Sequence, residues 1–164
     1  MRPFDYRRPA TLAEALALLE ADPEARPLAG GMTLIPTLKQ RLASPSLLVD
    51  LSGIEALKGI ARERGIVRLG AMVRHHEVSQ SSLVRAAIPA LADLAEGIGD
   101  PHVRSRGTIG GSVANADPAA DYPAAVVGLG ATVVTSRREI RDDDFFTGLF
   151  ETAPNRATNT PTVA

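Results

Sequence analysis

Residues 104–121 have the sequence RSRGTIGGSVANADPAAD, whereas most of the remaining chain has the pattern of ordinary core, turn or surface. Within the fifteen residues that begin at Gly107, this stretch holds three glycines, two hydroxyl side chains, one amide and two carboxylates. Glycine has no Cβ, so a polar group can come close to its backbone N–H. The stretch therefore indicates a place where the backbone meets a polar, anionic partner.

A second loop of similar character comes earlier, at residues 29–33, with the sequence AGGMT. Its Gly-Gly pair is followed by a predicted helix, whose N-terminus offers unpaired N–H groups and the positive end of the helix dipole. In the later stretch, Thr108 and Ser112 flank the pair Gly110-Gly111. Two such turns can hold one diphosphate from two sides. A Gly-Gly pair also suits an ordinary tight turn, so either loop taken alone leaves both interpretations open.

The composition excludes several classes of protein. The 164 residues are 45% hydrophobic and carry a net charge of −1, so we expect a packed core and no nucleic-acid partner. Cysteine is absent, which removes disulfides, thiolate metal ligands and cysteine nucleophiles together. No apolar run approaches the length of a membrane span, and the N-terminus has no signal-peptide pattern. We expect a cytoplasmic protein with no membrane span.

The best-known catalytic and nucleotide-binding motifs are missing. The sequence contains neither G-x-x-x-x-G-K-[ST] nor G-x-G-x-x-G, which disfavours a P-loop hydrolase and a Rossmann site. His75-His76-Glu77 suggests metal ligands, but in an extended segment the two histidines point to opposite sides and no third ligand has clear spacing. The preferred interpretation is that these residues lie on the surface or behind the direct contacts of a site. No nucleophile–base pair is evident, so we expect no catalytic side chains and no metal, and any chemistry has to come from a bound cofactor.

The N-terminal third of the chain predicts a small βαβ unit. A capping-box pattern at Thr11 and apolar residues at helical spacing predict a helix to about Ala21. Short strands are expected at residues 26–29 and 47–51, with a helix at 34–42 between them. The two strands would lie parallel, and the AGGMT loop would stand at the start of the intervening helix.

The rest of the chain predicts hairpins and helices. A hairpin is expected around Arg64-Gly65, followed by a helix that runs to about Ile98. Asp117 has the pattern of an N-cap, with a helix from Ala119 to about Leu129. The last predicted elements are two strands and a short helix, at residues 131–135, 139–141 and 142–146.

These elements predict an α+β (α/β) fold with two subdomains. The first is a small βαβ lobe at residues 1–53, and the second is a lobe of mixed or antiparallel sheet with helices at residues 54–152. Residues 153–164 have turn and linker composition without periodicity, so we expect them to form a divergent tail.

Asp121 is the carboxylate best suited to a ligand. It lies four residues after Asp117, in the first turns of an alanine-rich predicted helix. It is either a solvated carboxylate favoured by the helix dipole or an acceptor for the hydroxyl groups of a ribityl or ribose chain. Asn115 suits turn chemistry or a polar contact from the loop. The residues alone leave these alternatives open.

Several motifs together resemble a known family, the FAD-binding medium subunit of molybdenum hydroxylases of the carbon monoxide dehydrogenase and xanthine dehydrogenase type. The resemblance extends from about Phe4 to Thr152. The segments that carry it are FDYRRP (4–9), AGGMTLIP (29–36), LLVDL (47–51), GAMVRHH (70–76), RSRGTIGGS (104–112) and NADPAAD (115–121).

The resemblance implies that FAD binds between two α/β subdomains, with the two glycine loops on its diphosphate and Asp121 on its ribityl or ribose region. Ile98 and Asp117 are additional site residues under this resemblance. The loop residues that it assigns to FAD are Ala29, Gly30, Gly31, Met32, Thr33 and Leu34 in the first loop, and Thr108, Ile109, Gly110, Gly111 and Ser112 in the second.

The resemblance also implies partners: a [2Fe-2S] small subunit and a molybdopterin-containing large subunit. In that arrangement the chain is the electron-transfer flavoprotein subunit of an oxidoreductase, which passes electrons from the clusters through FAD to an external acceptor, and the substrate site lies elsewhere. Residues 154–164 do not resemble the family, and we expect a C-terminally truncated member. The alternative hypothesis is a truncated, non-catalytic interaction module without stable flavin. A nucleotide-binding hydrolase ranks last because the P-loop is missing.

Overall fold

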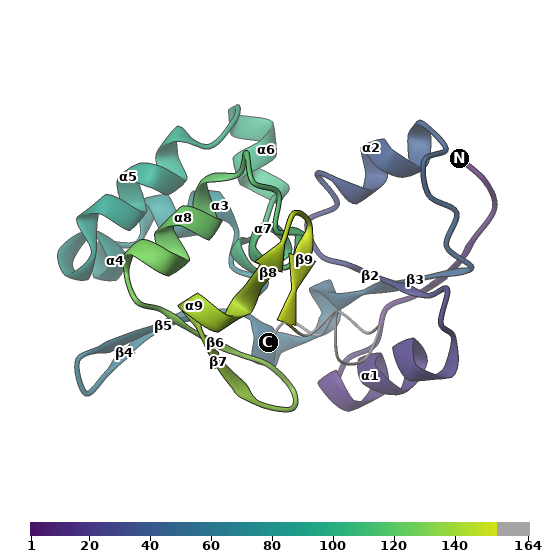
Figure 1. Cartoon of the computed structure of the whole chain (residues 1–164), viewed down its shortest axis with the longest axis horizontal. Coiled ribbons are helices and arrows are strands. Elements are labelled where there is room, and N and C mark those ends of the chain that lie inside the picture. Colours follow the sequence, from purple (N-terminus) through teal and green to yellow (C-terminus); the bar gives the residue numbers. More distant parts are fainter. Residues whose placement is uncertain (154–164) are drawn as a thin grey trace.

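The computed structural model describes residues 1–153, which form two packed regions side by side (Figure 1). Apart from Ala153, the predicted tail at residues 153–164 lies outside the described residues. The N-terminal region contains a parallel sheet in the order β1-β3-β2. Its strands are β1 (Asp5–Arg7), β2 (Arg26–Leu28) and β3 (Leu47–Asp50).

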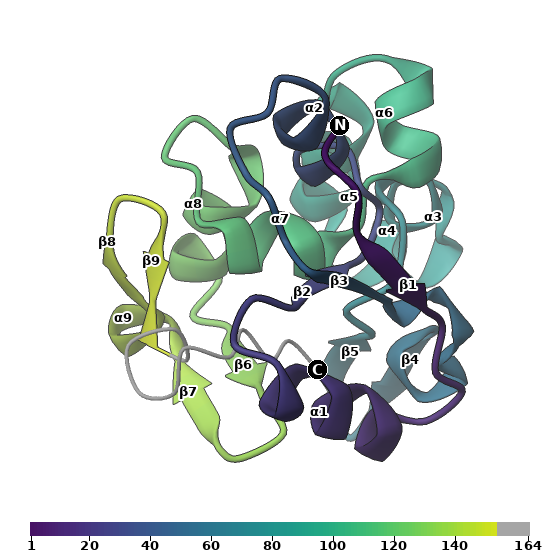
Figure 2. The same ribbon diagram turned by 90° about the vertical axis from the view of Figure 1, so that its right-hand side faces the viewer.

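Two helices cover this sheet. Helix α1 (Leu12–Ala21) and helix α2 (Leu34–Lys39) lie on opposite sides of it in both ribbon views (Figures 1 and 2). Strand β2, helix α2 and strand β3 confirm the predicted βαβ unit with its parallel pair. Strand β1 adds a third strand that the sequence pattern did not reveal, because all three of its residues are exposed and show no alternation.

Capping and burial explain why α1 forms where it does. The Thr11 hydroxyl accepts a hydrogen bond from the backbone N–H of Glu14 at 3.2 Å, which confirms the predicted cap. Ala15 and Leu19 then face the first hydrophobic core, which also takes in residues of β3. Two short 3-10 turns lead out of this region, η1 (Leu51–Gly53) and η2 (Glu55–Leu57).

The second region is built mainly from helices, with strands in separate antiparallel pairs. Together with the parallel sheet of the first region, they confirm the predicted α+β class. The helices are α3 (His75–Gln80), α4 (Ser82–Ala87), α5 (Pro89–Gly97), α6 (Pro101–Arg106), α7 (Ile109–Asn115), α8 (Asp121–Gly128) and α9 (Asp142–Phe145). The strand pairs are β4 (Ile60–Glu63) with β5 (Ile66–Leu69), β6 (Thr132–Val134) with β7 (Glu139–Arg141), and β8 (Phe146–Gly148) with β9 (Glu151–Thr152).

The hairpin β4–β5 confirms the prediction made from Arg64-Gly65. Both turn residues have positive φ, 51° and 88°, as a tight hairpin turn requires. A second hydrophobic core then runs from Val73 to Phe145. Ile60 and Leu69 of the β4–β5 hairpin already pack against this second core, although Met72, which follows them, belongs to the first. The subdomain boundary near residue 53 stays a prediction.

Two sequence expectations, one about the end of helix α2 and one about the segment at His75, were wrong. Helix α2 ends at Lys39, not at residue 42, because Arg41 takes a positive φ of 62° and turns the chain away. Leu42, expected on the buried face, is 74% exposed. The segment expected to be extended at His75 is instead the first turn of α3. His75 is therefore in the interior, where only 5% of it is exposed.

The central stretch is more helical than expected. Gly110 and Gly111 lie inside the first turn of α7, and not in a turn that precedes a helix. Helix α8 begins at Asp121, with Ala120 as its N-cap, so Asp117 is not the predicted helix cap. The Asp117 carboxylate instead accepts a hydrogen bond from the backbone N–H of Ala119 at 2.9 Å and closes a turn.

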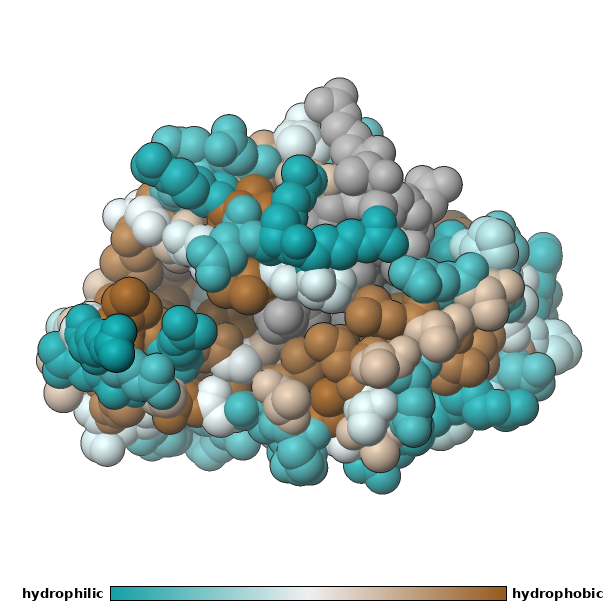
Figure 3. All heavy atoms as spheres, turned by 90° about the horizontal axis from the view of Figure 1, so that it is seen from below, coloured by the Kyte–Doolittle hydropathy of each residue, from teal (hydrophilic) through white to brown (hydrophobic). Residues whose placement is uncertain are grey.

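The surface seen from below Figure 1 has apolar residues in its middle, between hydrophilic stretches on either side (Figure 3). Exposed apolar area is normal for a folded protein and does not by itself mark a site. Among residues 1–153, no helix is both long and apolar enough to cross a bilayer.

Candidate cofactor site

The two glycine loops lie directly against each other. A Cβ placed on Gly30 would stand 2.8 Å from the Cα of Gly107 and closer still to the carbonyl oxygen of Arg106. A Cβ placed on Gly111 would lie 3.5 Å from the Cβ of Ala29. The backbone of the first loop therefore packs on the backbone that enters the second. Two segments about eighty residues apart in sequence meet at one place, where they can share one ligand.

The first loop has backbone donors to offer. Within the described residues, the N–H groups of residues 30–34 make no hydrogen bond. Gly31 has a φ of 75°, which glycine adopts without strain and other residues rarely do. Met32 and Thr33 are exposed, so the loop is open to solvent. A run of unpaired N–H groups on accessible backbone is suited to an anion such as a diphosphate.

The second loop differs, because its backbone is already bonded to the protein. Ile109 donates to the carbonyl of Val73 at 3.0 Å, and Gly110 donates to that of Ala71 at 2.9 Å. The Gly111 N–H donates to the Thr108 hydroxyl oxygen at 3.1 Å, as a helix cap. These bonds hold the loop in shape without a ligand. The side chains of the loop, above all the hydroxyl of half-buried Ser112, remain as groups that can contact one.

Close packing also explains one of the loop glycines. A Cβ on Gly110 would stand 2.5 Å from the Cβ of Ala71, so a side chain there would push the two segments apart. Gly110 is therefore needed for the approach of the segment at residues 71–75, whatever binds nearby. The sequence could not distinguish this role from ligand approach, because both favour glycine.

Asp121 lies at the start of α8, exposed, and next to a buried aromatic pair that the sequence did not reveal. Tyr122 is fully buried, and its ring stands 5.2 Å from the His75 ring at an interplanar angle of 36°. Burial lowers the pKa of His75 to about 4, against the opposing pull of the Asp121 carboxylate. Burial also raises the pKa of Tyr122 above its ordinary value. Both side chains are therefore neutral near pH 7.

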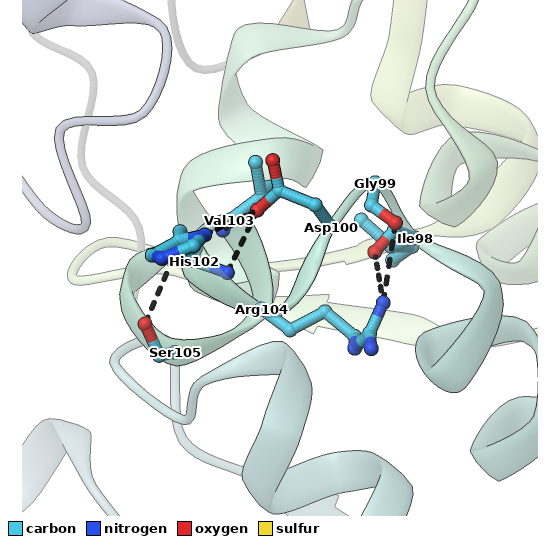
Figure 4. A network of polar contacts seen from close by, with 7 residues as sticks. All are labelled: Ile98, Gly99, Asp100, His102, Val103, Arg104 and Ser105. Atoms are coloured by element: carbon cyan, nitrogen blue, oxygen red, sulfur yellow. Dashed lines mark hydrogen bonds and ion pairs between the residues drawn. The ribbon is translucent and has the colours of Figure 1, made fainter.

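Ile98 lies at the end of α5, in a bend that Arg104 holds. The Arg104 guanidinium donates to the carbonyls of Ile98 and Gly99 at 3.0 and 3.2 Å (Figure 4). The Asp100 carboxylate caps α6 by accepting from the backbone N–H groups of residues 102 and 103. This network fixes the path of the chain from α5 into the second loop. Asp117, the other additional residue, lies half-buried in its turn after α7.

A surface pocket of about 360 Å³ lies between α3, α5 and α6. It contains none of the predicted site residues. Its lining is formed by His76, Ser79, Gln80, Glu96, Pro101, Arg104 and Ser105. In the part of the chain that the structure describes, no three His, Asp or Glu side chains are grouped to hold a metal ion.

Comparison with known proteins places the two loops in a family context. Residues 2–159 match the family described as FAD binding domain in molybdopterin dehydrogenase. The chain is 39% identical over 157 residues to the glyceraldehyde dehydrogenase medium chain of Sulfolobus acidocaldarius, covering 93% of this chain and 56% of that one. It is 43% identical over 155 residues to the carbon monoxide dehydrogenase medium chain of Afipia carboxidovorans, covering 92% of this chain and 54% of that one.

Solved structures agree with this match. Quinoline 2-oxidoreductase from Pseudomonas putida 86 superposes with a TM-score of 0.92 at 37% identity, over 99% of this chain and 57% of that one. Reconstituted CO dehydrogenase from Oligotropha carboxidovorans gives a TM-score of 0.89 at 42% identity, over 93% of this chain and 55% of that one. The chain spans about half the length of the curated relatives that it matches.

Proposed function

The chain belongs to the family of FAD binding domains in molybdopterin dehydrogenases, and on that premise we propose that it is the FAD-binding, electron-transferring part of a molybdenum hydroxylase. One observation supports the proposal most: the first glycine loop presents a run of backbone N–H groups without partners among the described residues, and it packs against the second loop. An FAD diphosphate needs several donors close together, and this loop supplies them.

Each predicted site residue except Gly110, which packs on Ala71, has a place in this proposal. The N–H groups of Gly30 to Leu34 would donate to diphosphate oxygens, and Ala29 lies beside Gly111, where the two loops meet. The hydroxyl of half-buried Ser112 adds a polar contact from the second loop, and buried Thr108 holds that loop in shape by capping α7. The remaining proposed contacts are Asp121 to ribityl or ribose hydroxyls, the apolar side chains of Ile98 and Ile109, and Asp117.

Bound FAD would supply one- and two-electron redox chemistry, which no side chain of this cysteine-free sequence supplies. The chain's own residues bind and orient the cofactor. We further propose that a [2Fe-2S] small subunit delivers electrons to this part of the complex, that a molybdopterin-containing large subunit holds the substrate site, and that an external acceptor takes the electrons up. Relatives named as medium chains of dehydrogenases support this arrangement.

The test is direct binding of FAD by the purified chain. The chain is saturated with FAD, separated from free cofactor by gel filtration, and examined by its visible absorption spectrum. We expect flavin absorption to elute with the protein at a ratio close to one. The matched variant Gly31→Ala, which forces a positive φ of 75° on alanine, should elute with less flavin while remaining folded. A wild-type chain that elutes without flavin contradicts the proposal and favours an interaction module without cofactor.

A further inference from the structure

The segment that leads into α3 is hydrogen-bonded to the backbone of the second loop. His75 donates its backbone N–H to the Gly107 carbonyl at 3.0 Å, and Ile109 donates to Val73 at 3.0 Å. Arg74 and Thr108 face each other in an antiparallel bridge. Two backbone hydrogen bonds therefore join this segment to the loop, and His75 is the last residue of the segment that takes part in them.

The His75 ring occupies the space where Gly107 would carry a side chain. A Cβ placed on Gly107 would lie 2.5 Å from the His75 Nε2 and 2.8 Å from its Cδ2. The ring also lies against Tyr122, which directly follows Asp121 in α8, with the two ring centroids 5.2 Å apart. The ring thus packs on both the segment that enters the second loop and the start of α8, and the second loop and α8 both carry proposed FAD contacts.

The polar atoms of this buried pair are not used elsewhere in the described structure. The His75 Nδ1 and the Tyr122 hydroxyl are both buried without a hydrogen-bond partner among residues 1–153. A buried polar atom without a partner costs free energy, so a pair of them at one place calls for an explanation beyond core packing. An apolar residue of similar volume would fill the space at lower cost, unless the shape of the imidazole is itself required.

We propose that His75, backed by Tyr122, is a positioning residue of the flavin site that sets the distance between the second loop and Asp121. It acts through Gly107 and α8. This inference rests on the proposed function, because the geometry that the ring sets is that of the FAD contacts. Its neutral state, a result of burial, lets the ring pack here without a counter-ion.

A double-mutant cycle on the full chain tests the inference, with His75→Ala, Gly107→Ala and the double variant. FAD dissociation constants come from flavin fluorescence, and the visible circular dichroism of bound flavin reports its orientation. We expect each single variant to weaken FAD binding about ten-fold and to change the circular dichroism. The double variant should bind no more weakly than the poorer single one, because the new methyl group enters the space that the imidazole leaves.

The outcomes separate this inference from the proposed function. If the wild-type chain binds no FAD, both the proposed function and this inference are contradicted. If wild type binds FAD and His75→Ala keeps the same affinity and circular dichroism, or if the two substitutions are additive, the positioning role alone falls. Val84→Ala, in the same hydrophobic core but on α4, is the control: it should lower the melting temperature without changing either flavin signal. Should His75→Ala not fold, His75→Asn takes its place, with the same change expected in both signals.

Discussion

Gly30→Ala is the substitution whose effect follows most directly from the structure. The added Cβ would stand 2.8 Å from the Cα of Gly107 and from the Arg106 carbonyl carbon, and closer still to the carbonyl oxygen. Carbon atoms in contact are normally about 3.5 Å or more apart, so the methyl group overlaps by roughly 0.7 Å or more. All three of these atoms belong to backbone, which cannot rotate away as a side chain can. The first loop has to move away from the second.

Overpacking of this kind costs about 1–3 kcal/mol. Because the displaced backbone carries the proposed phosphate donors, FAD binding should weaken by about ten-fold or more, which corresponds to about 1.4 kcal/mol. The assay is a fluorescence titration with FAD, together with a thermal melt of the chain without cofactor. Both the affinity and the melting temperature should fall.

Gly128→Ala is the matched control. No atom of residues 1–153 lies within 4 Å of a Cβ at that position, and Gly128 is the last residue of helix α8. Alanine favours a helix over glycine, so stability should stay the same or rise slightly, and FAD affinity should not change. A Gly30→Ala variant that binds FAD and melts as the wild type does would refute the close packing of the two loops.

Three further predictions concern residues behind the loops. The pKa of folded His75 is lowered from 6.5 to about 4, so the unfolded chain binds the extra proton in that interval, and stability should fall as the pH drops from 6.5 toward 4. Urea denaturation should show this slope flattened in His75→Gln; an equal slope in both proteins would contradict the assignment. Tyr122→Phe removes a buried hydroxyl without a partner in the described structure, so its melting temperature should match or exceed that of wild type, and a clear loss would reveal a hidden partner. Arg104→Met removes the bonds to the Ile98 and Gly99 carbonyls, and chemical denaturation should show a loss of about 1–2 kcal/mol, whereas an unchanged midpoint would mean that the network in Figure 4 is not stabilising.

Local signals in the sequence predicted the parts of the fold that local signals control. The Thr11 cap placed α1, and Arg64-Gly65 placed the β4–β5 hairpin, because each depends on residues next to it in the chain. Strand β1 escaped prediction because its three residues are exposed and it is defined only by pairing with β3. Helix α7 was not predicted because Gly110 and Gly111 disfavour a helix locally. The hydrogen bonds that support it join it to residues 71–73, which are distant in sequence.

For the site as well, the sequence motifs were predictable and the contacts between distant segments were not. The two glycine motifs could be found in the sequence, and their joint resemblance to one family indicated that they serve one ligand. Which loop keeps unpaired donors could not be predicted, because that depends on Ala71 and Val73 lying behind the second loop. His75 was expected in an extended segment, either on the surface or behind the direct contacts of a site, and the first turn of α3 directs it inward.

The claim that the first loop binds the diphosphate of FAD is tested most directly by comparing two ligands on the wild-type chain. One titration uses FAD and the other riboflavin, which has the same ring system and ribityl chain but lacks the diphosphate and the adenosine attached to it, and each is followed by flavin fluorescence. Saturable binding of FAD with far weaker binding of riboflavin is the predicted result. Equal affinity for the two ligands, or no binding of FAD, would contradict the claim.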